Sequence, residues 1–158
     1  MYRVLLAFLF FNFCFSQNYY IYVAAESDDT VSVLKFDGET IEETDRITVG
    51  IMPTENEGPH GITIDPSGKY WYLTLAHGSP YGSLVKYSTQ NNEPLSKVEL
   101  GLFPATMEIS PKTGLIYAVN FNLHGLMRTS TVSVVDPEYM VEITVSYTHL
   151  TLPTNDLV

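Results

Sequence analysis

Cysteine and basic residues are scarce in this 158-residue chain, and both shortages restrict what it can do. The single cysteine excludes an intramolecular disulfide and any metal site built from several thiolates. Eight Lys and Arg residues face 18 Asp and Glu residues, which gives a formal net charge of −10. This excess has the wrong sign for binding a phosphate backbone or an anionic membrane, so we expect no nucleic-acid partner.

Helical periodicity and common catalytic motifs are also missing. No long segment between residues 19 and 144 repeats apolar residues at helical spacing. Neither a GxSxG elbow nor a Gly-rich phosphate loop occurs, so an esterase or a nucleotide enzyme has no support. Short runs rich in β-branched and aromatic residues are present instead, separated by Gly, Pro, Asn and Asp. These runs predict an all-β fold with strands at 19–25, 31–36, 40–49, 61–65, 69–76, 83–88, 96–100, 105–110, 115–120 and 131–136.

The N-terminal segment MYRVLLAFLFFNFCFSQ has the pattern of a secretory signal peptide. Arg3 precedes an apolar run that ends at Phe15, and the small residue Ser16 follows. The run is short for a bilayer span, although a membrane anchor or a buried strand is the alternative. We expect cleavage after residues 1–16, which removes Cys14. The mature chain is then expected to be secreted or periplasmic, with no transmembrane segment.

The C-terminal segment has an unusual sequence. VSYTHLTLPT, from Val145 to Thr154, back-translates without a mismatch to DNA that resembles the transposase end and adapter of tagmentation sequencing libraries. We therefore expect residues 145–158 to be an artefactual tail, and we assign no function to His149. The alternative is a natural strand with this sequence.

The remaining sequence contains an internal repeat. PHGITIDPSG, beginning at residue 59, matches PATMEISPKTG, beginning at residue 104, with an offset of 45 positions. Periods of about 40–50 residues with four strands each are typical of β-propellers, in which each repeat forms one blade. We therefore predict a partial β-propeller over residues 17–144, with blades at roughly 19–49, 59–101 and 104–144.

Three segments carry a family resemblance: IYVAAESDDTVSVLKF, GPHGITIDPSGKYWYLT and LIYAVNFN with TVSVVD. They resemble YVTN-type β-propeller repeats, which are related in pattern to cytochrome d1-type and lactonase-type propellers. The resemblance implies a fragment of about two and a half to three four-stranded antiparallel blades, where the family closes a ring of about seven. The first unit lacks its innermost strand, which the far end of the chain often supplies in a complete ring.

Three histidines, each followed by glycine, are predicted to lie in loops on one side of the propeller, which we call the top face: His60, His77 and His124. Acidic residues are expected beside them at Glu26, Asp28 and Glu57. Imidazoles with nearby carboxylates can ligate Zn, Cu or Fe, or supply a base near neutral pH. These residues are therefore candidate ligand-binding or metal-binding groups. The alternative is that the histidines hydrogen-bond loop backbone between blades.

The function that follows from these observations is binding. We expect an exported scaffold that binds a small molecule or a protein through its top-face loops. An enzyme is the first alternative: a periplasmic metal- or haem-linked oxidoreductase, or a lactonase-type hydrolase, that uses His60 with residues of missing blades. A cell-surface structural or adhesion module is the second. The sequence identifies neither the cofactor nor the ligand, because propellers host unrelated functions on one scaffold.

Overall fold

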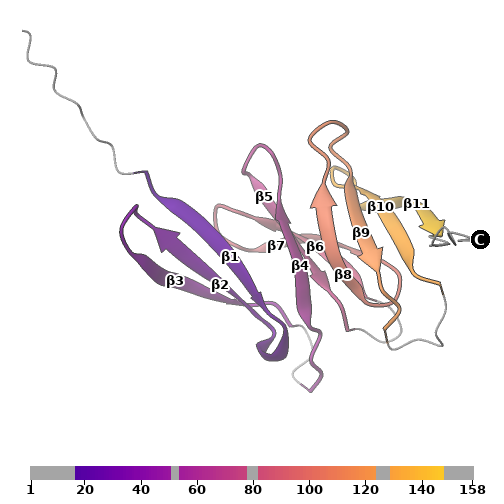
Figure 1. Cartoon of the computed structure of the whole chain (residues 1–158), viewed down its shortest axis with the longest axis horizontal. Coiled ribbons are helices and arrows are strands. Elements are labelled where there is room, and N and C mark those ends of the chain that lie inside the picture. Colours follow the sequence, from indigo (N-terminus) through magenta and orange to yellow (C-terminus); the bar gives the residue numbers. More distant parts are fainter. Residues whose placement is uncertain (1–16, 51–53, 78–81, 124–128, 148–158) are drawn as a thin grey trace, which may run out of the picture.

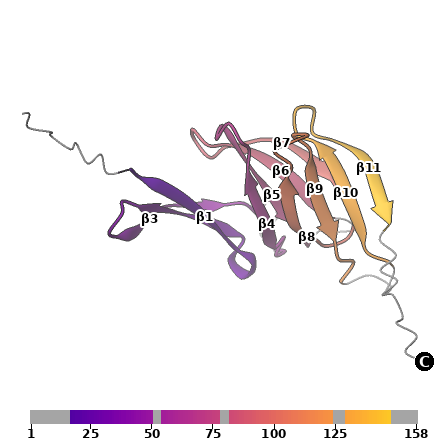
Figure 2. The same ribbon diagram turned by 45° about the horizontal axis from the view of Figure 1, so that its top comes forward.

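Three antiparallel sheets lie side by side in the order of the chain (Figures 1 and 2). The computed structural model describes residues 17–50, 54–77, 82–123 and 129–147. Sheet A has three strands, and a short 3-10 helix, η1 (Glu26–Asp28), connects its first two. Its strands are β1 (Tyr19–Ala25), β2 (Thr30–Phe36) and β3 (Ile41–Thr48).

Sheets B and C each have four strands, and every strand pairs with the next one along the chain. Sheet B contains β4 (Pro59–Ile64), β5 (Tyr70–Leu75), β6 (Ser83–Ser88) and β7 (Pro94–Glu99). Sheet C contains β8 (Pro104–Ile109), β9 (Ile116–Asn120), β10 (Thr131–Asp136) and β11 (Val141–Tyr147). One incomplete and two complete four-stranded units confirm the predicted all-β propeller fragment.

The predicted strands agree closely with the observed ones, apart from one omission. The ranges of β1, β6 and β10 agree with the prediction at both ends. No strand was predicted for β11, which pairs with β10 from Val141 to Tyr147 and has a bulge near Val134. Four of its seven residues precede the predicted tail and lie within the predicted third blade. The first three residues of that predicted tail continue β11, and residues 148–158 lie outside the described structure.

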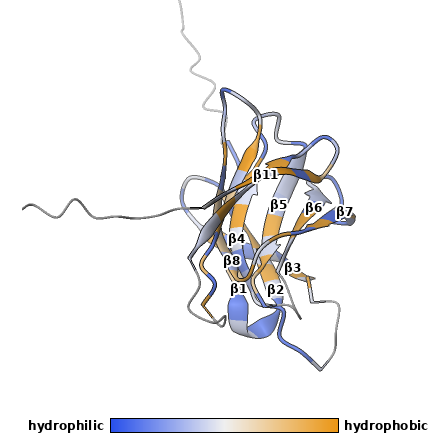
Figure 3. Cartoon of the chain, turned by 90° about the vertical axis from the view of Figure 1, so that its right-hand side faces the viewer, coloured by the Kyte–Doolittle hydropathy of each residue, from blue (hydrophilic) through white to orange (hydrophobic). Residues whose placement is uncertain are grey.

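Strand β5 shows how the three sheets share a core. Sheet B lies between the other two, so β5 is covered on both faces and is almost fully buried. Successive side chains of a strand point to opposite faces. Trp71 and Leu73 therefore pack against sheet A, whereas Tyr72 packs against sheet C. Hydropathy colouring shows a hydrophilic region where β1 and β2 meet (Figure 3).

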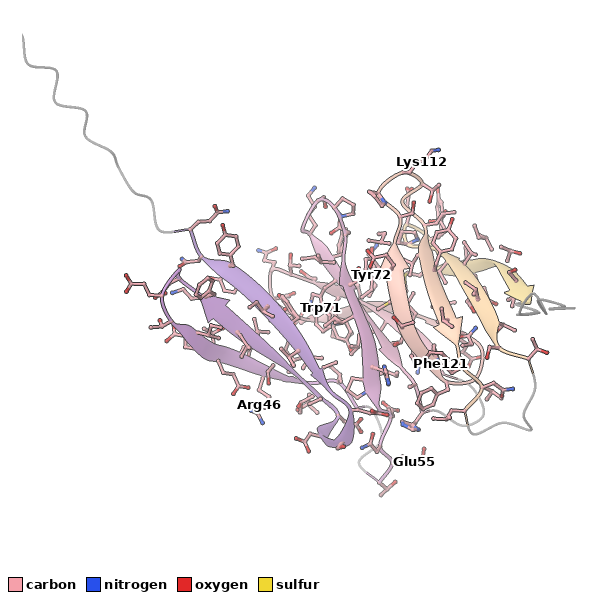
Figure 4. All side chains as sticks on the ribbon, viewed as in Figure 1. Arg46, Glu55, Trp71, Tyr72, Lys112 and Phe121 are labelled. Carbon is pink, nitrogen blue, oxygen red and sulfur yellow. The ribbon has the colours of Figure 1, made fainter. Side chains whose placement is uncertain are left out.

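The top face is the end of the sheets that lies at the bottom of Figure 1. Helix η1 and the segments before β4 and β8 meet there. Figure 4 places Glu55 and Phe121 at this end and Lys112 at the opposite end. In the described part of the chain, no helix is long and apolar enough to cross a membrane.

Candidate functional site

His60 is the second residue of β4, whereas the sequence placed it in the preceding loop. It is exposed, and its Nδ1 lies 2.9 Å from the carbonyl oxygen of Ala105 in sheet C. A carbonyl oxygen can only accept, so Nδ1 carries the proton, and Nε2 of the neutral ring keeps its lone pair. Gly61 allows this approach, because a Cβ there would lie 2.7 Å from the Ala105 oxygen. His60 thus bridges two blades and still offers a basic nitrogen.

His77 follows β5 and contacts sheet A. Its Nε2 lies 3.1 Å from Oε1 of Glu26, which is the first residue of η1. Its backbone N–H donates to the carbonyl oxygen of Glu57, at 2.9 Å. A carboxylate that accepts from one ring nitrogen fixes the orientation of an imidazole. Glu26 and His77 therefore form an oriented pair between two blades.

Phe103 joins the two histidines into one cluster. Its ring centroid lies 5.7 Å from that of His60 and 5.1 Å from that of His77, and both contacts are edge-to-face. Phe103 is buried and has a left-handed backbone, with φ at +54°. A bulky residue with positive φ is uncommon and is stable only where its surroundings hold it. We call Glu26, His60, His77 and Phe103 the rim cluster.

Phe103 was not among the predicted site residues, although the repeat contained a signal for it. Aligning the two repeats on Pro59 and Pro104 puts Phe103 opposite Gly58, and the structure gives both residues positive φ. The same pattern identifies the residue of sheet C that is equivalent to His77. The backbone N–H of Asn122 bonds the Leu102 carbonyl as that of His77 bonds the Glu57 carbonyl, so Asn122 is the equivalent of His77.

The other predicted site residues have different positions. His124 lies outside the described residues. Asp28 is exposed in η1, and no hydrogen bond places it in the rim cluster. Glu57 contributes its backbone carbonyl to His77, and its carboxylate adds to the rise in the pKa of Tyr87, which burial raises to about 12. His60 hydrogen-bonds the backbone of the neighbouring blade, as the alternative predicted, and its role in ligand binding stays a prediction.

The described residues do not form a metal centre. Among them, no three His, Cys, Asp or Glu side chains come close enough to hold one metal ion. The rim cluster has two imidazoles and one carboxylate around an aromatic ring, with no Lys or Arg among its members. This combination suits hydrogen bonding and ring contact with a small ligand.

The fold defined by these sheets is that of a β-propeller, and comparison with solved structures supports this. The chain is similar to hydrazine synthase of Kuenenia stuttgartiensis, with a TM-score of 0.68 and 23% identity over 82% of this chain and 34% of that one. It is also similar to a protein of unknown function from Desulfotomaculum acetoxidans DSM 771, with a TM-score of 0.62 and 18% identity over 82% of this chain and 37% of that one.

A third similar structure is a proposed 6-phosphogluconolactonase from Bacteroides fragilis NCTC 9343, with a TM-score of 0.59. Identity is 16% over 78% of this chain and 33% of that one. The chain thus spans about a third of the length of these structures. No family model and no curated protein matches the sequence. At these identities the likeness shows the fold and leaves the activity open.

Proposed function

We propose that the chain is part of an exported β-propeller protein that binds a small ligand at the rim cluster. The observation that carries this proposal is the convergence of three sheets on one point of the top face. Sheet A supplies Glu26, sheet B supplies His60 and His77, and sheet C supplies Phe103. Sites assembled from several elements around an aromatic surface with a few polar groups are typical of small-molecule binding. The signal-peptide pattern and the YVTN-like repeats support export.

The chemistry of the cluster favours a ligand without net negative charge. The lone pair on Nε2 of His60 and the carboxylate of Glu26 both accept hydrogen bonds. Hydroxyl or amine groups match these acceptors, and the Phe103 ring supplies an apolar contact. A phosphorylated ligand would meet the Glu26 carboxylate with no Lys or Arg in the cluster to balance it. We therefore propose a neutral polyhydroxy compound or an amine as the ligand class.

Lactone hydrolysis is a second candidate, and the tautomer of His60 favours it. Because Nδ1–H is held by the Ala105 carbonyl, Nε2 is the basic nitrogen. A base at that position can take a proton from a water molecule as the water oxygen attacks the lactone carbonyl carbon. The ring C–O bond then breaks, and the alkoxide that leaves takes up the proton that Nε2 of His60 received from the water, which restores the neutral imidazole. The likeness to a proposed 6-phosphogluconolactonase extends to the fold alone, and the rim cluster favours a lactone without a phosphate group.

The test is an NMR titration of the full chain that follows the imidazole signals of its histidines. The probes are glucono-δ-lactone, putrescine, 6-phosphogluconate and Zn²⁺. We expect the lactone or the diamine to shift the His60 and His77 signals, and the phosphorylated acid to leave them unchanged. His60→Ala and His77→Ala should remove the binding, whereas His149→Ala, the matched control, should retain it.

The outcomes separate the candidates. Acid release from glucono-δ-lactone above the spontaneous rate, lost in His60→Ala, would establish the hydrolase. Stoichiometric Zn²⁺ binding that depends on His60 would show that the site binds a metal ion and not an organic ligand. If none of the four probes shifts either histidine signal, the rim cluster is not the binding site.

A further inference from the structure

The linker from sheet A to sheet B is longer than the linker from sheet B to sheet C. Val49 donates its backbone N–H to the Asp29 carbonyl, and Leu100 donates to the Gly82 carbonyl, so these pairs are equivalent. Val49 and Pro59 are ten positions apart, whereas Leu100 and Pro104 are four apart, so the first linker has six more residues. Ordering a longer linker costs more conformational entropy, and fixing its end requires additional bonds.

Asp29 supplies these bonds. Its carboxylate accepts from two successive backbone N–H groups at the end of the linker, that of Glu57 at 3.0 Å and that of Gly58 at 2.8 Å. The Gly58 N–H also lies 2.9 Å from the side-chain oxygen of Asn56, so the Glu57 N–H reports on Asp29 more cleanly. Hydrogen bonds to a carboxylate are stronger than those between neutral groups.

The two residues whose N–H groups Asp29 binds also hold, through their carbonyl groups, the segment that carries His77. The Glu57 carbonyl accepts from the His77 N–H at 2.9 Å, and the Gly58 carbonyl accepts from the Ala76 N–H at 2.8 Å. The His77 ring lies against Gly58, because a Cβ on Gly58 would lie 2.1 Å from its Cδ2 atom. One peptide group therefore separates Asp29 from the backbone of His77.

The equivalent position in sheet B confirms that the aspartate is particular to the first junction. Gly82 occupies it, and a Cβ there would lie 2.1 Å from Cδ of Pro104. The short junction is therefore closed by direct packing on a proline. Asp29, with φ at +49°, has a left-handed backbone that glycine adopts readily and that aspartate tolerates better than most residues.

We propose that Asp29 is a positioning residue of the rim cluster, which fixes the end of the longer linker and thereby sets where His60 and His77 stand. The carboxylate does not act on the ligand. It acts through the Glu57 and Gly58 peptide groups, which lead directly into β4 on one side and bond the end of β5 on the other. The effect of Asp29 on ligand binding rests on the proposed function, whereas its effect on the linker does not.

The test compares Asp29→Gly with Asp29→Asn and with the control Asp28→Asn in the full chain. Asp29→Gly reproduces the residue found at Gly82 without backbone strain, and Asp29→Asn keeps one oxygen acceptor. We expect Asp29→Gly to accelerate hydrogen exchange of the Glu57 amide by about 10- to 100-fold, the range for losing a hydrogen bond to a charged acceptor. Asp29→Asn should accelerate exchange of this amide to an intermediate extent, and Asp28→Asn should not accelerate it.

Two further readouts distinguish positioning from general stability. The NOE between the Gly58 Hα protons and the His77 ring should weaken in Asp29→Gly, while amides in the middle of β6 keep their protection. Binding of glucono-δ-lactone and putrescine should weaken in the same order of variants. If the parent chain binds neither probe, the proposed function fails, and the exchange and NOE measurements still decide the role of Asp29. Unchanged exchange at Glu57, or equal acceleration throughout sheet B, would overturn the assignment.

Discussion

Replacing Gly58 with alanine probes the packing of His77 most directly. Gly58 has φ at +60°, and a Cβ there would lie 2.1 Å from Cδ2 of the imidazole. A left-handed backbone costs an alanine about 1–2 kcal/mol, and an extra methyl group in a packed contact costs about 1–3 kcal/mol. We therefore expect Gly58→Ala to lower the free energy of unfolding by about 2–5 kcal/mol and to move His77 away from Phe103.

Gly68→Ala is the matched control for this change. Gly68 has φ at +70°, and a Cβ there would meet nothing within 4 Å, so only the backbone cost of about 1–2 kcal/mol applies. Sheet C supports this comparison. There, Phe103 occupies the position equivalent to Gly58, and Asn122 occupies the position equivalent to His77. A side chain with a left-handed backbone is therefore tolerated at this position when the equivalent of His77 is not a histidine. The clash, and not the backbone alone, should therefore make Gly58→Ala costly.

Urea unfolding followed by Trp71 fluorescence gives the free energies. Repeating Gly58→Ala in a His77→Ala background should reduce its cost to that of Gly68→Ala, because the ring that it meets is gone. Equal destabilisation by Gly58→Ala and Gly68→Ala in the parent chain, within about 0.5 kcal/mol, would refute the packing of His77 on Gly58.

Three other predictions concern the core and the sheet edge. The pKa of Tyr87 is raised to about 12 by burial, so stability should fall as pH rises from about 10 through 12, and Tyr87→Phe should reduce that fall in alkaline unfolding curves. Asn92→Gly keeps the left-handed turn but loses the bond from Trp71 Nε1, and fluorescence-detected unfolding should show a loss of about 1–2 kcal/mol. Ile21→Lys on the open edge of β1 should reduce self-association in sedimentation velocity. A parent chain that is already monomeric would contradict this prediction.

The open edge of β1 also shows what could be predicted from the sequence. The first unit was predicted to lack its innermost strand, and among the described residues β1 has no partner beyond β2. Alternating apolar residues and turn residues located the other strands, because strand periodicity is a local property. The bulge that bends β4 at His60 and Gly61 is less local, because it depends on the pairing of β4 with β5, and the sequence therefore placed His60 in a loop.

Three of the four members of the rim cluster were predictable from the sequence, but their arrangement was not. The His-Gly loops and nearby acidic residues pointed to His60, His77, Glu26 and Glu57 on one face. The pairing of His77 with Glu26 could not be chosen over other pairings, because the two residues are 51 positions apart and belong to different sheets. Phe103 was missed because a Phe-Pro step gives no indication of the blade that the ring will reach.

The sequence by itself determined the acid excess, the repeat and the all-β character of this protein. Each of these depends on residue types and on spacing within a few positions, which a linear chain records directly. Only the tertiary structure decided that one phenyl ring contacts two imidazoles and that Asp29 binds the end of the linker before β4. Those contacts depend on how each sheet twists and packs against the next, and no local spacing specifies that geometry.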